Sequence, residues 1–277
     1  MGEQFGPWYL ESLIAVGGLG EVWRATSSER RFDGVTPAVK RLLTHLVRND
    51  ESREQFAVEQ MLAISLPRHP NVVRGIEPGV VEGRPYLAFE LAPGVDLRHI
   101  VAPPPTPGNT APIAVALPRE RALSIVRAAC DGVAHLHAFG WVHGDVCPGN
   151  LIVDRATGVA GGGGERVTLV DLGVARRIGQ GGAVRGTHAY MAPEQVQGHT
   201  WTEATDVFSL GVVLWELVSG KRLFHRGPPW LTMSAVVEDD VPKLADSALD
   251  AIARAALAKD PAQRIPTAAE LGARLCN

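Results

Sequence analysis

The first ninety residues contain short apolar runs with interspersed polar positions, a pattern typical of β-strands. Three such runs are WYLESLIAV, GEVWRAT and TPAVKRLL. One helical stretch follows, ESREQFAVEQMLAISL, and Pro67 ends it because proline cannot continue a helix. The pattern predicts a small α+β lobe.

Long helical segments begin near Pro118. The segment PRERALSIVRAACDGVAHLHAFG has Pro118 at its predicted first helical position and Gly140 just after its end. Its apolar residues recur at steps of three and four, as one face of a helix requires. These residues are Ala122, Val126, Ala129, Val133 and Leu136. The pattern predicts a second, mainly helical lobe.

Two segments interrupt these patterns and are expected to be surface insertions. Residues 102–118 are rich in proline, and residues 155–167 contain a glycine-rich turn between apolar runs. We interpret both as loops, in preference to a proline-motif ligand, and the sequence has no internal repeat.

The composition excludes several classes of function. The 277 residues are 45% hydrophobic and carry a net charge of −3, so we expect neither nucleic acid nor an anionic membrane as a partner. The most apolar run, FSLGVVLWELV, contains Glu216 and is too short to span a bilayer. Three cysteines, with no targeting signal, indicate a reducing compartment, and we expect a cytoplasmic protein.

A glycine-rich turn lies between the first two long apolar runs. In LIAVGGLGEVWRA, three glycines, Gly17, Gly18 and Gly20, allow the backbone to approach a phosphate group with no Cβ in the way. A plain tight turn has the same composition. The strand–turn–strand order does not fit a dinucleotide-binding fold, which needs a helix after the turn.

Charged and amide side chains follow along the chain, most of them beside short apolar runs. Lys40 lies in the run PAVKR, and Glu59 lies on the next helix, where its carboxylate could hold the lysine. Asp145, Asn150 and Asp171 come from VHGDVCPGN and VTLVDLGVA, and oxygen ligands of this kind hold magnesium on a nucleotide. Each residue taken singly also fits a turn or an exposed strand position. Their order along the chain favours a catalytic site.

In this order the motifs resemble those of bacterial serine/threonine protein kinases of the eukaryotic-like (Hanks) type. The resemblance runs from the glycine turn to KDPAQRIPTAAELGARL at residues 259–275. It implies an α+β, bilobal protein-kinase fold with a small β-rich N-lobe, one main helix there, and a larger helical C-lobe. We expect one kinase domain over residues 1–277, with the N-lobe at 1–89, a hinge at 90–94 and the C-lobe at 95–277.

The resemblance also implies an ATP site. Gly17 and Gly20 match the second and third glycines of the family's nucleotide loop, and Ala15 replaces the first. Lys40 would hold the α and β phosphates and pair with Glu59. The full expected set is Ile14, Gly17, Gly18, Gly20, Val22, Ala38, Lys40, Phe89, Glu90, Ala92, Asp96 and Ile152.

Within that set, the motif positions imply separate roles. Val22 and Ala38 would lie above the adenine ring and Ile152 below it. The stretch LAFELAPGVDL resembles the hinge, with Phe89 as gatekeeper. The remaining members would bind through backbone or carboxylate groups: Glu90 and Ala92 to the adenine, Asp96 to the ribose.

For phosphate transfer, the resemblance assigns catalysis to Asp145, Lys40, Glu59, Asn150 and Asp171. Asp145 would orient the substrate hydroxyl, and Asn150 and Asp171 would bind Mg²⁺. Leu172 replaces the usual phenylalanine of the magnesium-binding motif. Thr187 in GTHAYMAPE marks a platform for serine or threonine substrates. Three residues are expected to be structural: Glu194 paired with Arg264, and Asp206 anchoring the catalytic loop.

The catalytic loop departs from the family pattern at two positions. Gly144 occupies the place of the arginine that normally receives a phosphate from the activation loop. The loop itself, residues 174–186, contains no Ser, Thr or Tyr. The two absences agree, because a loop that cannot be phosphorylated needs no arginine to hold the phosphate. We infer that loop phosphorylation does not control this protein.

Cys147 is the second departure, since a lysine usually stands there and neutralises the transferring phosphoryl group. Its loss would cost about 2 to 4 kcal/mol of transition-state stabilisation, roughly a hundred- to thousandfold in rate. One hypothesis is that Arg176, Arg177 or Arg185 supplies the charge, and solvated arginines are the alternative. Cys147 is either a tolerated small residue or a redox switch.

The sequence therefore predicts an ATP- and Mg²⁺-dependent protein kinase acting on serine or threonine of a protein substrate. The alternative is a pseudokinase, a nucleotide-binding regulator of a partner protein, which Ala15, Gly144 and Cys147 support. A small-molecule kinase is disfavoured by GTHAYMAPEQ and by Arg264, which resemble a protein-substrate platform and its support.

Overall fold

The computed structural model describes residues 2–29, 32, 34–102, 115–155 and 165–276. The chain forms two compact units. Unit 1 contains Met1–His69, Val73–Ala92 and Asp171–Gly173, and unit 2 contains Pro70–Val72, Pro93–Val170 and Val174–Asn277.

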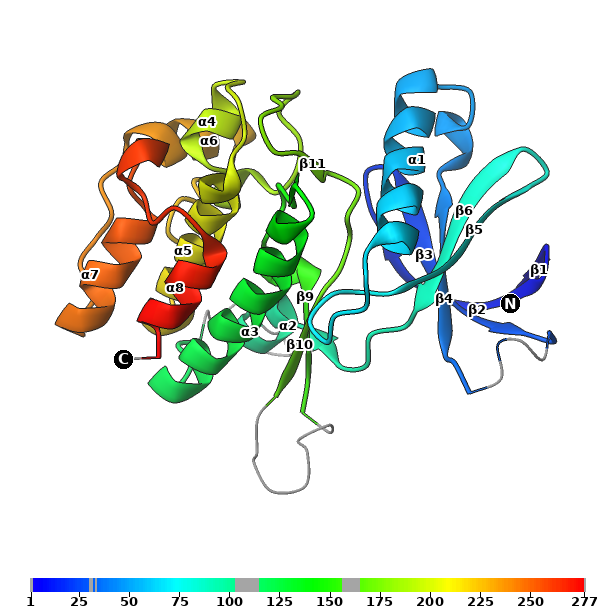
Figure 1. The fold of residues 1–277 in the computed structure, drawn as a ribbon, viewed down its shortest axis with the longest axis horizontal. Coiled ribbons are helices and arrows are strands. Elements are labelled where there is room, and N and C mark those ends of the chain that lie inside the picture. Colours follow the sequence, from blue (N-terminus) through cyan, green and yellow to red (C-terminus); the bar gives the residue numbers. More distant parts are fainter. Residues whose placement is uncertain (1, 30–31, 33, 103–114, 156–164, 277) are drawn as a thin grey trace. The chain divides into compact units, whose positions relative to one another are not determined.

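Unit 1 is built on an antiparallel sheet, drawn in blue to cyan in Figure 1, with strand order β1-β2-β3-β4-β6-β5. Its strands are β1 (Glu3–Phe5), β2 (Trp8–Val16), β3 (Gly20–Ser27), β4 (Pro37–Leu42), β5 (Gly75–Val81) and β6 (Arg84–Glu90). The three runs predicted from the sequence correspond to β2, β3 and β4. Register places Lys40 of β4 between Val22 of β3 and Leu87 of β6.

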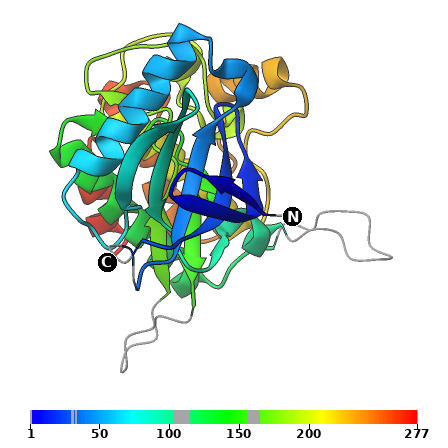
Figure 2. The same ribbon diagram turned by 90° about the vertical axis from the view of Figure 1, so that its right-hand side faces the viewer.

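One helix, α1 (Asp50–Ser65), packs against β5 and β6 of this sheet, and Figure 2 shows it running across one face. The Asn49 side chain begins the helix by accepting a hydrogen bond from the Ser52 backbone N–H at 2.8 Å. The helix ends just before Leu66 and Pro67, as the sequence predicts.

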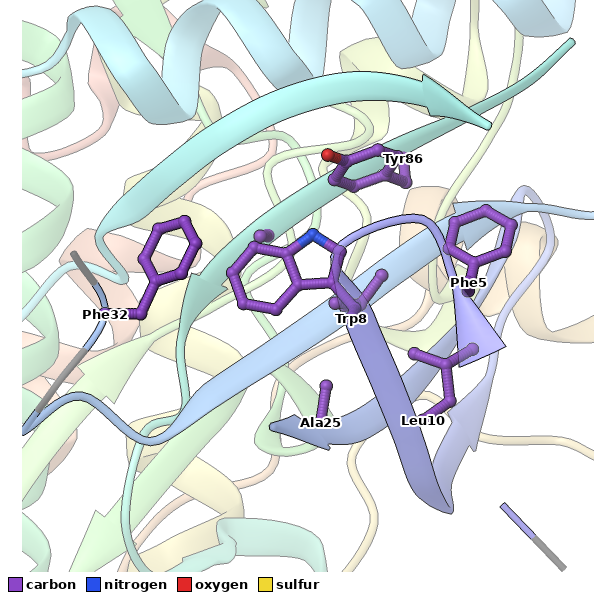
Figure 3. Close-up of a cluster of buried hydrophobic side chains, with 8 residues drawn as sticks. Phe5, Trp8, Leu10, Ala25, Phe32 and Tyr86 are labelled. Carbon is purple, nitrogen blue, oxygen red and sulfur yellow. The ribbon is translucent and has the colours of Figure 1, made fainter. Parts of the chain in front are cut away.

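Aromatic side chains form the core beneath β1 and β2, and Figure 3 shows Trp8 at its centre. Trp8 is completely buried, and its ring centroid lies 4.6 Å from that of Phe32. Phe5 meets Tyr86 edge-on at 5.7 Å. This cluster fixes the start of β2, the strand that leads into the glycine turn.

Unit 2 is mainly helical. Its helices are α2 (Leu97–Val101), α3 (Arg119–Ala138), α4 (Pro193–Val196), α5 (Glu203–Ser219), α6 (Pro229–Glu238), α7 (Ser247–Ala256) and α8 (Ala268–Arg274). Helix α5 is buried along almost its whole length and packs against α3, α7 and α8 (Figure 1). A helix that is apolar on nearly all sides belongs at the centre of a bundle.

Two small sheets in unit 2 hold the loops of the candidate site. One has the order β10-β9-β7 and the other pairs β11 with β8. Their strands are β7 (Val95–Asp96), β8 (Trp141–Val142), β9 (Leu151–Asp154), β10 (Arg166–Leu169) and β11 (Arg176–Arg177).

The helix predicted from Pro118 is present as α3, with one correction. Pro118 is the residue before the first helical position, because its ψ of 137° is extended, and Arg119 begins the helix. Gly140 follows the end with a φ of +79°, as expected for a glycine there. The two predicted insertions lie largely outside the described residues, at 103–114 and 156–164. The predicted limits of lobes and hinge stay predictions.

We predict that Trp8→Ala lowers the free energy of unfolding by about 3 to 5 kcal/mol, because the ring leaves a large cavity. Trp8→Phe should lose much less, since the buried indole nitrogen has no hydrogen-bond partner among the described residues. Urea unfolding followed by circular dichroism measures both. Tyr9→Ala, at the half-exposed neighbouring position, is the matched control and should change stability by about 0.5 kcal/mol.

Candidate active site

Unit 1 holds one amine between two carboxylates. Lys40 on β4 donates to both carboxylate oxygens of Glu59 on α1, at 2.7 and 2.8 Å, and to Oδ1 of Asp171 at 2.7 Å. Lys40 and Glu59 are buried, whereas the Asp171 side chain is 44% exposed. The predicted pair of Lys40 and Glu59 is therefore formed, and Asp171 joins it as the carboxylate nearest to solvent.

The charges in this cluster shift the pKa values of Lys40 and Glu59. Burial alone would lower the pKa of Lys40, but the carboxylates of Asp171 and Glu59 raise it well above its ordinary value. Burial raises the pKa of Glu59 to about 7; Asp171 adds to this rise, and Lys40 opposes it. The cluster has one negative charge in excess when all three groups are ionised, so a cation close to Asp171 would stabilise it.

The backbone around Asp171 is shaped to present its carboxylate. Asp171 has a φ of +62°, in the left-handed region, and its Oδ1 accepts the Gly173 N–H at 3.2 Å. The Gln55 side chain of α1 donates to the Gly173 carbonyl at 2.6 Å. A Cβ at Gly173 would lie 3.0 Å from the Glu59 carboxylate. Glycine therefore permits the close approach, and Leu172 beside it is buried.

The predicted glycine turn joins β2 to β3. The Gly17 N–H donates to the Gly20 carbonyl at 2.8 Å and closes the turn. A Cβ on Gly20 would lie 2.8 Å from the Arg41 carbonyl, so packing against β4 requires glycine there. A Cβ on Gly18 would meet nothing within 4 Å, and one on Gly17 only the Gly20 carbonyl at 3.7 Å. The protein's own packing therefore does not explain Gly17 and Gly18.

The residues expected around adenine occupy several elements. Ile14 on β2 is exposed, Val22 on β3 half-buried and Ala38 on β4 fully buried. Phe89 on β6 is half-buried and pairs with Ala38 across the sheet. Glu90 ends the strand, and its N–H donates to the Arg74 carbonyl at 2.9 Å. Their binding roles, with that of Ala92, stay predictions.

Two further members of the expected ATP set lie in unit 2. Asp96 and Ile152 are opposite each other in β7 and β9. The Asp96 carboxylate accepts the His99 N–H at 3.0 Å, which begins α2, and lies 2.7 Å from the His99 ring. Helix capping thus accounts for Asp96 by itself, and its expected bond to ribose stays a prediction.

Both carboxylate oxygens of Asp145, in unit 2, accept hydrogen bonds. Its Oδ1 accepts the Thr187 backbone N–H at 2.8 Å, and its Oδ2 accepts Nδ2 of Asn150 at 3.0 Å. The same Asn150 nitrogen donates to the Asp145 carbonyl at 2.8 Å, so the amide oxygen is the atom left to face a metal. A Cβ at Gly186, where φ is +114°, would lie 3.0 Å from Oδ1. Glycine at 186 therefore lets the backbone at Thr187 approach the carboxylate.

Asp206 on α5 anchors the loop that leads into Asp145. Its two oxygens accept the N–H groups of His143 and Gly144, each at 2.8 Å, and one also bonds the His137 ring at 2.9 Å. Burial would raise the pKa of Asp206, but its bond to His137 and neighbouring groups lower it. Its stabilising effect is thus present above the ordinary aspartate pKa and is lost as pH falls through the lowered value.

Cys147 occupies a buried position next to Thr187. The Thr187 hydroxyl donates to its sulfur at 3.4 Å. Burial and the nearby charge of Asp145 raise the pKa of the Cys147 thiol to about 12. The group that stands in place of the usual lysine is therefore neutral at physiological pH.

The hypothesis that Arg176 or Arg177 replaces that charge finds no support in their contacts. The Arg176 guanidinium lies over the Trp201 ring at 5.3 Å, and that of Arg177 over Trp141 at 4.3 Å. Arg177 also donates to the Phe139 carbonyl at 3.2 Å. Both groups stack on aromatic rings, but only Arg176 is half-buried, whereas Arg177 is exposed to solvent. The same hypothesis for Arg185 stays a prediction.

The predicted ion pair of Glu194 and Arg264 is present and buried. Arg264 donates to the two Glu194 oxygens at 2.8 and 3.1 Å. The same guanidinium donates to the Ala204 carbonyl at 2.7 Å and so ties the pair to α5. Because an unpaired charge is costly in the interior, the pair fixes this part of unit 2.

Sequence reasoning missed several supporting residues. Gln55 and Gln195 act through side-chain bonds to backbone carbonyls, and such bonds leave no periodic signal. Gly186 could have been noticed as the glycine directly before the platform threonine. Trp201 carried only the signal of a large apolar residue in a polar stretch.

The described residues set limits on other sites. They include no cluster of three or more His, Cys, Asp or Glu side chains that could bind a metal ion by themselves. Nor does any helix among them combine the length and apolar character needed to cross a bilayer.

This chain is similar in sequence and in fold to known proteins. The protein kinase domain pattern matches residues 8–273. Serine/threonine-protein kinase PknB of Mycolicibacterium smegmatis is 34% identical over 96% of this chain, and PknJ of Mycobacterium tuberculosis is 30% identical over 97%. The chain spans 42% and 45% of the lengths of these two relatives.

The crystal structure of the M. tuberculosis PknI kinase domain shares the fold. It superposes with a TM-score of 0.74, and the likeness covers 99% of this chain and 97% of that one at 24% identity. Together with the family match over residues 8–273, this likeness settles the fold as bilobal and α+β. The chain belongs to the protein kinase domain family.

Proposed function

We propose that this protein transfers the γ-phosphate of ATP, with Mg²⁺, to serine or threonine of a protein substrate. The observation that carries the proposal is the buried Lys40 held between Glu59 and Asp171. Desolvating such a cluster costs free energy, and a site with no chemical task has no physical need to keep it. The serine/threonine kinases among the relatives support the same reaction class.

The chain's residues fit a nucleotide and its metal. Gly17 and Gly18 leave open the space that a Cβ would fill, as an approach to phosphate requires. Asp171 offers a half-exposed carboxylate, and Asn150 an amide oxygen. Magnesium is commonly bound by one or two such groups, with phosphate oxygens and water completing its shell. When bound, the metal would neutralise negative charge on the phosphates.

The remaining residues would bind the phosphates, hold the lysine in position and accept the proton of the substrate hydroxyl. Lys40 stays protonated and would contact the phosphates, while Glu59 fixes its position. Asp145 would accept a hydrogen bond from the substrate hydroxyl and take up its proton. The Thr187 N–H and the Asn150 amide restrict the rotation of that carboxylate, which keeps its orientation constant.

Activity of this kind would not depend on phosphorylation of residues 174–186, because that segment has no hydroxyl side chain. The neutral side chain of Cys147, in place of the usual lysine, would make the phosphate-transfer step slow. The alternative, a pseudokinase, is favoured by the same residue. Both proteins would bind ATP, and only a kinase would transfer phosphate.

We predict that Asp145→Asn abolishes phosphate transfer while ATP affinity changes less than about threefold, because the amide keeps the shape but cannot accept the proton. Radiolabelled ATP with Mg²⁺ and a basic protein substrate measures transfer, and calorimetry measures binding. Asp131→Asn, on α3, is the matched control. Equal labelling by wild type and Asp145→Asn would remove Asp145 from the mechanism. Binding without labelling of any protein would establish the pseudokinase.

Cys147→Lys should raise kcat by about ten- to a hundredfold, because it restores a positive charge near the transferring group. Cys147→Met, similar in length but neutral, should not raise it. Cys276→Lys adds the same charge at an exposed position and controls for net charge. A kcat that stays flat in Cys147→Lys would mean that another group already supplies the charge.

Iodoacetamide should modify Cys276 rapidly and Cys147 slowly at pH 7.5. Cys276 is exposed, whereas Cys147 is buried with its pKa raised to about 12 and so holds almost no reactive thiolate. Mass spectrometry of the folded protein measures the two rates, with unfolded protein as the reference in which both react. Comparable rates in the folded protein would instead favour the redox-switch interpretation of Cys147.

A further inference from the structure

Trp201 lies directly against the catalytic loop. Its side chain is completely buried just before α5. A Cβ on Gly144 would come within 2.5 Å of the ring atom Cζ3 and within 3.2 Å of Cε3. Gly144 also has a φ of +76°, which side chains rarely adopt. The ring thus fills the space beside Gly144, and any larger residue at 144 would collide with it.

The same tryptophan holds the first part of the activation segment, defined as residues 174–186. Its backbone carbonyl accepts the Gly179 N–H and its N–H donates to the Gln180 carbonyl, both at 2.9 Å. The Arg176 guanidinium lies over its ring at 5.3 Å. A Cβ on Gly182 would come within 2.4 Å of that guanidinium, so the segment folds closely over the stacked pair.

Gly144 connects this packing to the catalytic carboxylate. Its N–H donates to Asp206 at 2.8 Å, and its carbonyl accepts from the Gln195 side chain at 2.9 Å. Asp145 is the next residue in the chain. A shift of the ring would therefore be transmitted to Asp145 through one peptide unit.

We propose that Trp201 is a positioning residue that holds the activation segment against the catalytic loop without a phosphate group. Its ring contacts the loop at Gly144 and the segment at Arg176, and its backbone fixes Gly179 and Gln180. The inference deepens the proposed kinase function and rests on it, because Asp145 is what the ring positions.

The surroundings of the Trp201 ring indicate which of its properties would hold the activation segment. The indole nitrogen is buried and has no hydrogen-bond partner among the described residues. The ring therefore acts through its shape and its π face, on which a cation stacks. Phenylalanine preserves both in part, and alanine preserves neither.

The test combines hydrogen–deuterium exchange with steady-state kinetics on phosphatase-treated protein of verified intact mass. Wild-type residues 176–180 should be protected although no phosphate is present. In Trp201→Ala, exchange there should rise by about tenfold or more, because the local opening becomes easier. Its kcat should fall about tenfold, with the KM for ATP changed less than about threefold.

Two further variants separate positioning from loss of fold. Trp201→Phe should restore protection and kcat to within about threefold of wild type, because it keeps an aromatic face. Arg176→Gln removes the half-buried cation without emptying the core, and should raise exchange about threefold to tenfold. Arg274→Gln, in an exposed pair on α8, is the control and should match wild type.

The outcomes distinguish the two proposals. Unchanged exchange in Trp201→Ala and Arg176→Gln would overturn the role of Trp201, even in an active kinase. Absence of phosphate transfer by every protein, including wild type, would overturn the proposed function, while the exchange data still decide whether Trp201 holds the segment. Rapid exchange of residues 176–180 in unphosphorylated wild type would also overturn the inference.

Discussion

One buried carboxylate, Asp206, is the constraint on which unit 2 depends. It accepts hydrogen bonds from the two backbone N–H groups directly before Asp145 and from the His137 ring. Backbone N–H groups in such a loop have no partner in a helix or sheet, so without Asp206 they would be buried and unsatisfied. The acceptor comes from α5, which is buried along almost its whole length, so the loop is attached to the core of the unit.

In unit 1 the buried charge that needs a partner is positive. Lys40 is a buried cation, which is tolerable only with a carboxylate beside it, and Glu59 supplies that partner. Asp171 makes a second carboxylate and leaves the cluster with surplus negative charge on its exposed side. This arrangement suits a reaction that uses a bound cation, because the surplus negative charge lies on Asp171, the carboxylate that solvent can reach.

The sequence predicts much of this in advance, for identifiable reasons. Strands β2 to β4 and helix α3 follow from local periodicity, and the Lys40–Glu59 and Glu194–Arg264 pairs follow from the family motifs. Gly186 could be noticed as the glycine directly before Thr187, but the contact distances of Trp201 and Gly186 could not be predicted. Both depend on how close two distant segments approach, and neither local propensity nor spacing contains that distance. Pro118 was misplaced by one position because proline suits both the residue before a helix and its first turn.

The close packing of Gly144 against Trp201 also constrains how this sequence can evolve. An arginine at 144, the residue usual in the family, would require a left-handed backbone and would place its Cβ within 2.5 Å of the ring. Replacing Trp201 first would leave a void beside the loop before any arginine could fill it. Each single step is unfavourable, so the two positions form an epistatic pair. An arginine at 144 therefore requires both positions to change together.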